Sequence, residues 1–171
     1  MTAPAKLAHI VLRTGQLQTM IDWYCDVLDA RVAFATDFIA FTTYDDEHHR
    51  VAFVATGSDT RPTAGHTGLH HVAFTHATLD DLLGNYVRLR DQGISPFWCV
   101  NHGPTTSMYY EDPDGNHVEL QIDNFATDAE LDAWFATGAF AENPIGVTFD
   151  PEELHARFES GESFASLVVQ G

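Results

Sequence analysis

The sequence predicts an α+β fold built from two copies of one unit. A short apolar strand that contains His9 opens the chain, and a similar strand recurs 62 residues later around His71. Each copy is followed by apolar residues at helical spacing and then by several strand-like runs. We therefore expect two βαβββ modules, over residues 6–57 and 68–123, within one domain that spans residues 1–171.

The first module is expected to begin with a strand over residues 6–14, where apolar residues alternate until Gly15. Apolar residues with a 3.6-residue period then predict a helix. Its apolar face comprises Leu17, Met20, Ile21, Tyr24, Val27 and Leu28. Three further strands are predicted at residues 30–36, 38–44 and 50–56.

The second module repeats this order. A strand is predicted over residues 69–76, and Thr78 with Asp81 three residues later is typical of a helix start. Gly93 ends that helix. Strands follow at residues 96–100, 107–111 and 117–123, and Asp112-Pro113-Asp114-Gly115 predicts a tight turn between the last two.

The last segment, residues 124–171, has no counterpart in the repeat and is predicted to be a helical extension. Thr127 and Glu130 form a potential capping box. The pair Asp150-Pro151 is typical of a second helix start, with proline at the first helical position. Packing against an exposed sheet is the favoured role of these helices. A lid and a dimer contact are the alternatives.

The overall charge excludes several classes of partner. Among 171 residues, 8 are Lys or Arg and 25 are Asp or Glu, so the formal net charge is −17. Nucleic acids and anionic membrane surfaces are therefore not expected as partners. Two cysteines are too few for a disulfide framework, and no apolar run is long enough to cross a bilayer. We expect a cytoplasmic protein.

The repeated histidines point to a metal site. His9 and His71 occupy equivalent positions in the two modules, so symmetry favours their convergence, and Glu119 follows the predicted turn in the second module. Two imidazoles and one carboxylate form the facial triad typical of non-haem Fe(II) centres. A lone histidine in an apolar strand is more often a core residue than a ligand. The pairing of the two histidines favours ligation.

The same repeat shows how many ligands to expect. A constant offset of 62 places the first-module counterpart of Glu119 at Gly57, and residues 50–58 contain no carboxylate. A fourth protein ligand is therefore not expected. Coordination positions would remain open for substrate and dioxygen.

Three segments together carry a family resemblance. They are Lys6-Leu-Ala-His9-Ile-Val, Leu69-His-His71-Val-Ala-Phe74 and the run from Tyr109 through Glu-Asp-Pro-Asp-Gly to Glu119-Leu. Residues 6–123 resemble the vicinal oxygen chelate superfamily, which includes glyoxalases and bleomycin-resistance proteins, and specifically its type I extradiol ring-cleaving dioxygenases in a small single-pair form. The resemblance implies a curved mixed sheet around a metal site.

The resemblance also assigns roles to six residues. It implies that His9, His71 and Glu119 hold Fe(II), or in some members Mn(II). His49 matches the acid–base histidine of the family, His102 a histidine near substrate and oxygen, and Tyr109 a tyrosine beside the metal ligands. Without the resemblance, the two histidines are compatible with ordinary loops and Tyr109 with a core aromatic residue.

The expected function is Fe(II)-dependent cleavage of a catechol-type ring by dioxygen, with catechol or a 2,3-dihydroxybiphenyl-like diol as substrate. Phe97 and Trp98 could form an apolar ring pocket or belong to the core. The alternatives are a metal-dependent isomerase or lyase of the same fold and a non-catalytic, resistance-type binding protein. A homo-oligomer is expected from the resemblance.

Overall fold

The computed structural model describes residues 2–58, 60–61 and 67–170, which divide into two compact units. The first unit comprises Met1–Gly68 together with Asp112–Asn116, and the second comprises Leu69–Glu111 and His117–Gly171. Each unit has its own sheet and its own sheet-covering helix. No helix in the described ranges is long and apolar enough to cross a lipid bilayer.

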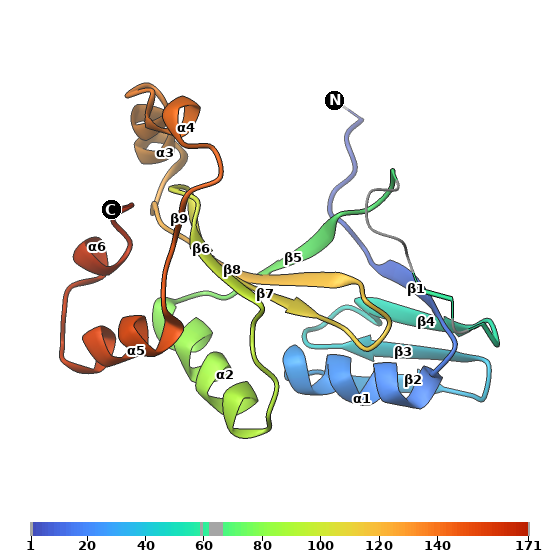
Figure 1. Cartoon of the computed structure of the whole chain (residues 1–171). Coiled ribbons are helices and arrows are strands. Elements are labelled where there is room, and N and C mark those ends of the chain that lie inside the picture. Colours follow the sequence, from blue (N-terminus) through green and yellow to red (C-terminus); the bar gives the residue numbers. More distant parts are fainter. Residues whose placement is uncertain (1, 59, 62–66, 171) are drawn as a thin grey trace. The chain divides into compact units, whose positions relative to one another are not determined.

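In the first unit, helix α1 (Leu17–Val27) lies on one face of a four-stranded sheet (Figure 1). The strands across the sheet are β1 (Ile10–Thr14), β4 (Val51–Ala55), β3 (Ile39–Thr43) and β2 (Arg31–Ala35). Strand β1 is parallel to β4, and the other neighbours are antiparallel. The order of the predicted elements in this unit is confirmed.

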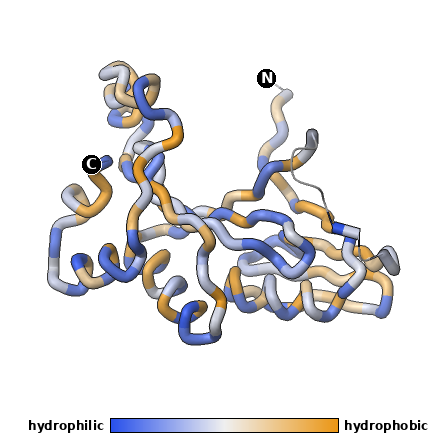
Figure 2. Tube along the Cα trace, in the orientation of Figure 1, coloured by the Kyte–Doolittle hydropathy of each residue, from blue (hydrophilic) through white to orange (hydrophobic). Residues whose placement is uncertain are grey.

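Burial of one apolar helix face holds the first unit together. The residues of α1 that face the sheet are Met20, Ile21, Tyr24 and Val27, and all four are buried. The ring of Tyr24 meets Phe53 of β4 edge to face, with centroids 5.2 Å apart. Hydrophobic and hydrophilic stretches alternate along α1 in Figure 2, as expected for a helix with one buried side.

The hydroxyl of Tyr24 makes a buried polar contact in the same unit. It donates a hydrogen bond to Asp112 Oδ2 at 3.1 Å. The Asp112 carboxylate also accepts hydrogen bonds from Asn116 and from the backbone N–H of Asp114. Burial raises the pKa of Asp112, and these donors counteract the rise. The turn predicted at residues 112–115 is confirmed by the Gly115 N–H, which donates to the Asp112 carbonyl at 2.9 Å.

We expect Tyr24→Phe to lower the free energy of unfolding by about 1–2 kcal/mol, because a buried carboxylate loses one of its donors. Urea unfolding measures the change. Tyr110→Phe is the matched control, since the buried Tyr110 hydroxyl has no hydrogen-bond partner among the described residues. Equal losses in the two variants would show that the contact with Asp112 does not stabilise the fold.

In the second unit, helix α2 (Leu79–Asp91) packs against a five-stranded sheet (Figure 1). The strands in order are β5 (His71–Thr75), β8 (His117–Asp123), β7 (Thr105–Glu111), β6 (Trp98–Asn101) and β9 (Val147–Thr148). Strand β5 is parallel to β8, and the pairs β8–β7 and β7–β6 are antiparallel. The first four strands of this sheet therefore repeat the pattern of the first sheet. Thr78 caps α2 as predicted, by accepting from the N–H of Asp81.

The C-terminal segment adds four helices and the edge strand β9 to the second unit. The helices are α3 (Asp128–Phe135), α4 (Ala139–Glu142), α5 (Pro151–Glu159) and α6 (Phe164–Leu167). The capping box of Thr127 and Glu130 and the proline start of α5 are confirmed. The sequence did not predict α4, β9 or α6, because each is too short to show a period.

Candidate active site

The six residues predicted to carry the chemistry are divided between the units. The first unit contains His9 and His49. The second unit contains His71, His102, Tyr109 and Glu119. Within each unit, the residues that it holds lie together.

In the first unit, the imidazole rings of His9 and His49 are neighbours, with centroids 4.3 Å apart. His49 also stacks on Phe41, at 4.3 Å and 12°. Phe41 follows Ala40, the cross-strand partner of the helix-facing Phe53, so its side chain lies on the sheet face away from α1. Val11 and Phe34 are 53% and 51% exposed, which leaves apolar surface beside the two histidines.

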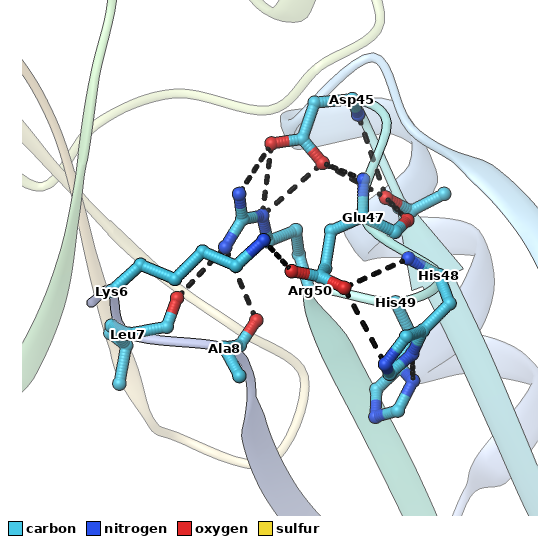
Figure 3. A network of polar contacts seen from close by, with 9 residues as sticks. Lys6, Leu7, Ala8, Asp45, Glu47, His48, His49 and Arg50 are labelled. Carbon is cyan, nitrogen blue, oxygen red and sulfur yellow. Dashed lines mark hydrogen bonds and ion pairs between the residues drawn. The ribbon is translucent and has the colours of Figure 1, made fainter. Parts of the chain in front are cut away.

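The first strand begins later than predicted, and Arg50 explains the difference. The expected strand started at residue 6, whereas β1 starts at Ile10, so His9 lies just before it. Arg50 Nη1 donates to the carbonyl oxygens of Leu7 at 2.8 Å and Ala8 at 3.2 Å (Figure 3). A side chain therefore occupies acceptors that a neighbouring strand would otherwise use.

The same guanidinium also holds the loop that precedes His49. Arg50 Nη2 lies 2.8 Å from Asp45 Oδ2, and Arg50 Nε donates to the same carboxylate at 2.9 Å (Figure 3). This pairing with Arg50 lowers the pKa of Asp45. Arg50 thus links the segment before His9 to the loop before His49.

His49 is favoured in its neutral form. Burial lowers its pKa, and the nearby His9 and His48 rings lower it further because a second positive charge would be repelled. A neutral imidazole can accept a proton at one ring nitrogen. This is the state that a general base requires.

In the second unit, His71 and Glu119 are in direct contact. His71 Nε2 lies 2.9 Å from Glu119 Oε2, and the glutamate side chain is only 5% exposed. His71 opens β5, and Glu119 lies in the middle of the parallel strand β8. Their side chains share one sheet face, and this places the two candidate ligands side by side.

Tyr109 lies on the same face. It is the direct cross-strand partner of Glu119, and its ring meets His71 edge to face at 5.3 Å. Burial raises the pKa of the Tyr109 hydroxyl, and the charge of Glu119 raises it further. The hydroxyl therefore stays protonated and available as a hydrogen-bond donor.

The C-terminal segment determines the orientation of His102. His102 Nδ1 lies 2.6 Å from the carbonyl oxygen of Ile145, and its Nε2 lies 3.0 Å from the Tyr109 hydroxyl. A carbonyl only accepts, so the proton of neutral His102 is on Nδ1, and Nε2 accepts from Tyr109. Sequence reasoning missed Ile145, since a backbone carbonyl leaves no residue-type signal.

Aromatic side chains line this sheet face in the second unit. Trp98 stacks on Tyr109 at 4.8 Å and 28° and contacts His102 edge to face at 5.7 Å. Phe97 is 53% exposed and contacts the ring of His117 at 4.8 Å. The sequence left open whether Phe97 and Trp98 belong to the core. The structure places both beside the candidate catalytic residues.

One position inferred from the repeat was wrong. The constant offset matched Glu119 to Gly57, but the two parallel strand pairs show a different equivalence. Ala73 pairs with Glu119 in the second unit, as Val11 pairs with Ala52 in the first. The first-unit counterpart of Glu119 is therefore Ala52. The offset is not constant because the stretch of chain between the two parallel strands is longer in the second unit than in the first. The conclusion that this position holds no carboxylate is unchanged.

The donor types in the second unit fit a metal of the Fe(II) class. An imidazole nitrogen and a buried carboxylate oxygen lie side by side at His71 and Glu119, and this combination suits Fe(II) and also Mn(II). Within the described ranges, no three or more His, Cys, Asp or Glu side chains are clustered as a metal site. His9 belongs to the other unit.

Comparison with known proteins gives consistent results. Residues 6–120 match the model of the Glyoxalase/Bleomycin resistance protein/Dioxygenase superfamily. The chain is 49% identical to biphenyl-2,3-diol 1,2-dioxygenase 2 of Rhodococcus globerulus, over 94% of this chain and 85% of the relative. It is 47% identical to biphenyl-2,3-diol 1,2-dioxygenase 3 of the same organism, over 99% and 90%.

A solved structure supports the fold. A glyoxylase/bleomycin resistance protein/dioxygenase domain from Frankia sp. EAN1pec superposes with a TM-score of 0.59 at 17% identity, over 71% of this chain and 99% of that domain. From the family match and the extent of identity to the two relatives, the chain belongs to the Glyoxalase/Bleomycin resistance protein/Dioxygenase superfamily and, within it, to the extradiol ring-cleaving dioxygenases.

Proposed function

We propose that this extradiol dioxygenase uses Fe(II), held by His9, His71 and Glu119, to open the ring of a biphenyl-2,3-diol-like catechol with dioxygen. The observation that carries the proposal is the contact between His71 Nε2 and Glu119 Oε2 on a sheet face that also bears Tyr109. The two Rhodococcus relatives, whose names specify biphenyl-2,3-diol, support the substrate class.

The proposed ligands would supply two imidazoles and one carboxylate, a donor set that leaves coordination positions for other molecules. Bound Fe(II) would act as a Lewis acid and as a template for the diol and dioxygen. Glu119 supplies the negative charge of the set from a site that excludes water from its side chain. Mn(II) fits the same donors, so anaerobic loading with each metal, followed by turnover, decides between them.

The aromatic side chains of the second unit favour a substrate with an apolar ring. Trp98 and the exposed Phe97 present ring faces and edges near Tyr109. Aromatic rings contribute to binding through buried apolar area and through edge-to-face contacts. A diol that carries a second ring would gain more from these contacts than catechol itself.

Protons are handled by residues of this chain. Neutral His49 accepts a proton from a catechol hydroxyl and can return it to the ring-opened product. The Tyr109 hydroxyl, kept protonated by burial and by the charge of Glu119, donates its hydrogen bond to His102 Nε2, so its oxygen is left to accept a hydrogen bond from a substrate hydroxyl. His102 orients the Tyr109 hydroxyl through their 3.0 Å contact.

The direct test is oxygen uptake with parallel visible absorbance, on protein loaded anaerobically with Fe(II) and then mixed with aerated catechols. We expect oxygen uptake that is matched by formation of a yellow ring-opened product. Uptake should be faster with 2,3-dihydroxybiphenyl than with catechol. An isomerase or lyase would consume no oxygen. A non-catalytic binding protein would not retain stoichiometric iron after gel filtration.

We expect His49→Ala to slow turnover by about a hundredfold or more, since general acid–base groups contribute on this scale. Its iron content should stay within error of the parent protein. Anaerobic iron analysis and oxygen uptake on the same sample measure both quantities. Unchanged turnover with full iron would remove His49 from the proposed role.

The cellular location and the oligomeric state of the protein stay predictions. A cytoplasmic location is checked by cell fractionation. A homo-oligomer is checked by sedimentation velocity over a range of protein concentrations.

A further inference from the structure

His48 lies between Glu47 and His49 in the loop that joins β3 to β4 in the first unit (Figure 3). Its Nδ1 atom is 2.6 Å from His49 Nδ1. Its Nε2 atom is 3.4 Å from Glu47 Oε1, and the same oxygen accepts from the backbone N–H of His48 at 3.3 Å. The side chain of His48 is otherwise largely exposed, at 70%.

The location of the protons follows from the chemistry of these partners. Glu47 forms an ion pair with Lys6, and this hydrogen bond lowers the pKa of Glu47, so its carboxylate is ionised and only accepts. His48 Nε2 must carry the proton that faces this carboxylate. A neutral His48 then has an unprotonated Nδ1. In the short contact between the two Nδ1 atoms, the donor must therefore be the Nδ1–H of His49, and the acceptor is His48 Nδ1.

We propose that His48 is a positioning residue that fixes His49 in the tautomer with its proton on Nδ1. The nitrogen left to accept a proton from the catechol is then His49 Nε2. This inference rests on the proposed acid–base role of His49. Its structural part, the tautomer, can be measured without any turnover.

Further contacts hold the loop that carries His48 and His49. The Glu47 backbone N–H donates to Asp45 Oδ1 at 3.0 Å, and Thr43 Oγ1 donates to the Glu47 carbonyl at 2.8 Å. Arg50 in turn holds Asp45 (Figure 3). Phe41 sets the plane of the His49 ring by stacking, while His48 sets the position of its proton. A base whose ring plane and tautomer are both fixed needs no rearrangement when substrate binds.

The tautomer is tested by long-range ¹H–¹⁵N correlation spectra of full-length protein labelled with ring-¹⁵N histidine, at pH 8. The peaks of His49 are assigned by their loss in His49→Ala. We expect a protonated Nδ1 and an unprotonated Nε2 in the parent protein. In His48→Phe, the proton should shift toward Nε2, the tautomer that free imidazole side chains prefer. In His48→Gln, whose amide oxygen can accept from Nδ1, the parent pattern should persist.

Turnover of the same variants, loaded with Fe(II), tests the consequence. We expect His48→Phe to lower kcat by about tenfold or more with KM within twofold, and His48→Gln to retain most of kcat. The matched control is His155→Phe, which removes a histidine that lies 3.8 Å from Glu159 on α5 and should leave kcat unchanged.

The outcomes separate the two proposals. A His49 proton on Nε2 in the parent protein, or a pattern unchanged in His48→Phe, overturns the inference about His48. Equal kcat in His48→Phe and the parent also overturns it, provided that His49→Ala is slow. If His49→Ala itself keeps full turnover, the acid–base role fails, while the tautomer measurement still decides the structural part.

Discussion

Glu119→Gln is expected to abolish stoichiometric iron binding and to reduce turnover by at least about a hundredfold. The substitution keeps the size of a side chain that is 5% exposed but removes its negative charge. Removal of a residue that only hydrogen-bonds to a metal ligand already lowers metal affinity or activity by about ten- to a hundredfold. Removal of a charged ligand is expected to lower metal affinity further. Iron analysis after anaerobic loading and gel filtration, with oxygen uptake on the same sample, measures both effects.

Glu111→Gln is the control for this experiment. Glu111 belongs to the neighbouring strand β7, and its side chain is 54% exposed, at 3.8 Å from His117. The same charge is removed from the same sheet, so iron content and turnover should remain those of the parent. Full iron content and turnover in Glu119→Gln would show that the metal, if required, is held elsewhere.

Gly146→Ala is expected to lower the free energy of unfolding by about 3 kcal/mol and to slow turnover. Gly146 has a φ of +98°, and a Cβ there would collide with the carbonyl oxygen of Asn101. The neighbouring Ile145 supplies the carbonyl that holds His102 Nδ1. A shift of this segment would therefore release both His102 and its contact with Tyr109. Urea unfolding and oxygen uptake measure the two effects.

Gly138→Ala separates backbone strain from this collision. Gly138 has a similar φ of +84°, but a Cβ at that position meets no atom within 4 Å. Its expected cost is only the left-handed strain of about 1–2 kcal/mol, with turnover unchanged. Equal losses of stability in the two variants, or full turnover in Gly146→Ala, would contradict the anchoring role of this segment.

The parts of the molecule that could be predicted from the sequence are those determined by neighbours along the chain. The helix start at Thr78 and the capping box at Thr127 depend on residues three positions apart. The turn at residues 112–115 depends on its own proline, aspartates and glycine. The repeat of the histidine strand indicated the two modules, and sequence similarity to a known family then indicated the roles of the site residues.

Other features were decided only by contacts between residues distant in the chain. Arg50 binds the carbonyls of Leu7 and Ala8, so the first strand begins at Ile10 instead of at residue 6. Parallel pairing, not a constant offset, makes Ala52 the counterpart of Glu119. These outcomes depend on which distant backbone groups a side chain can contact and on how the strands align. Neither produces a periodic pattern of residues in the sequence.

Residue patterns along the chain therefore predicted the module order, the helix starts that depend on local caps, and the residue types that suit an Fe(II) site. Tertiary structure alone decided that His71 Nε2 meets Glu119 Oε2, and that the Ile145 carbonyl orients His102. Helices and turns are stabilised by hydrogen bonds between residues a few positions apart, whereas an active site depends on strands and loops brought together by burial of their apolar faces.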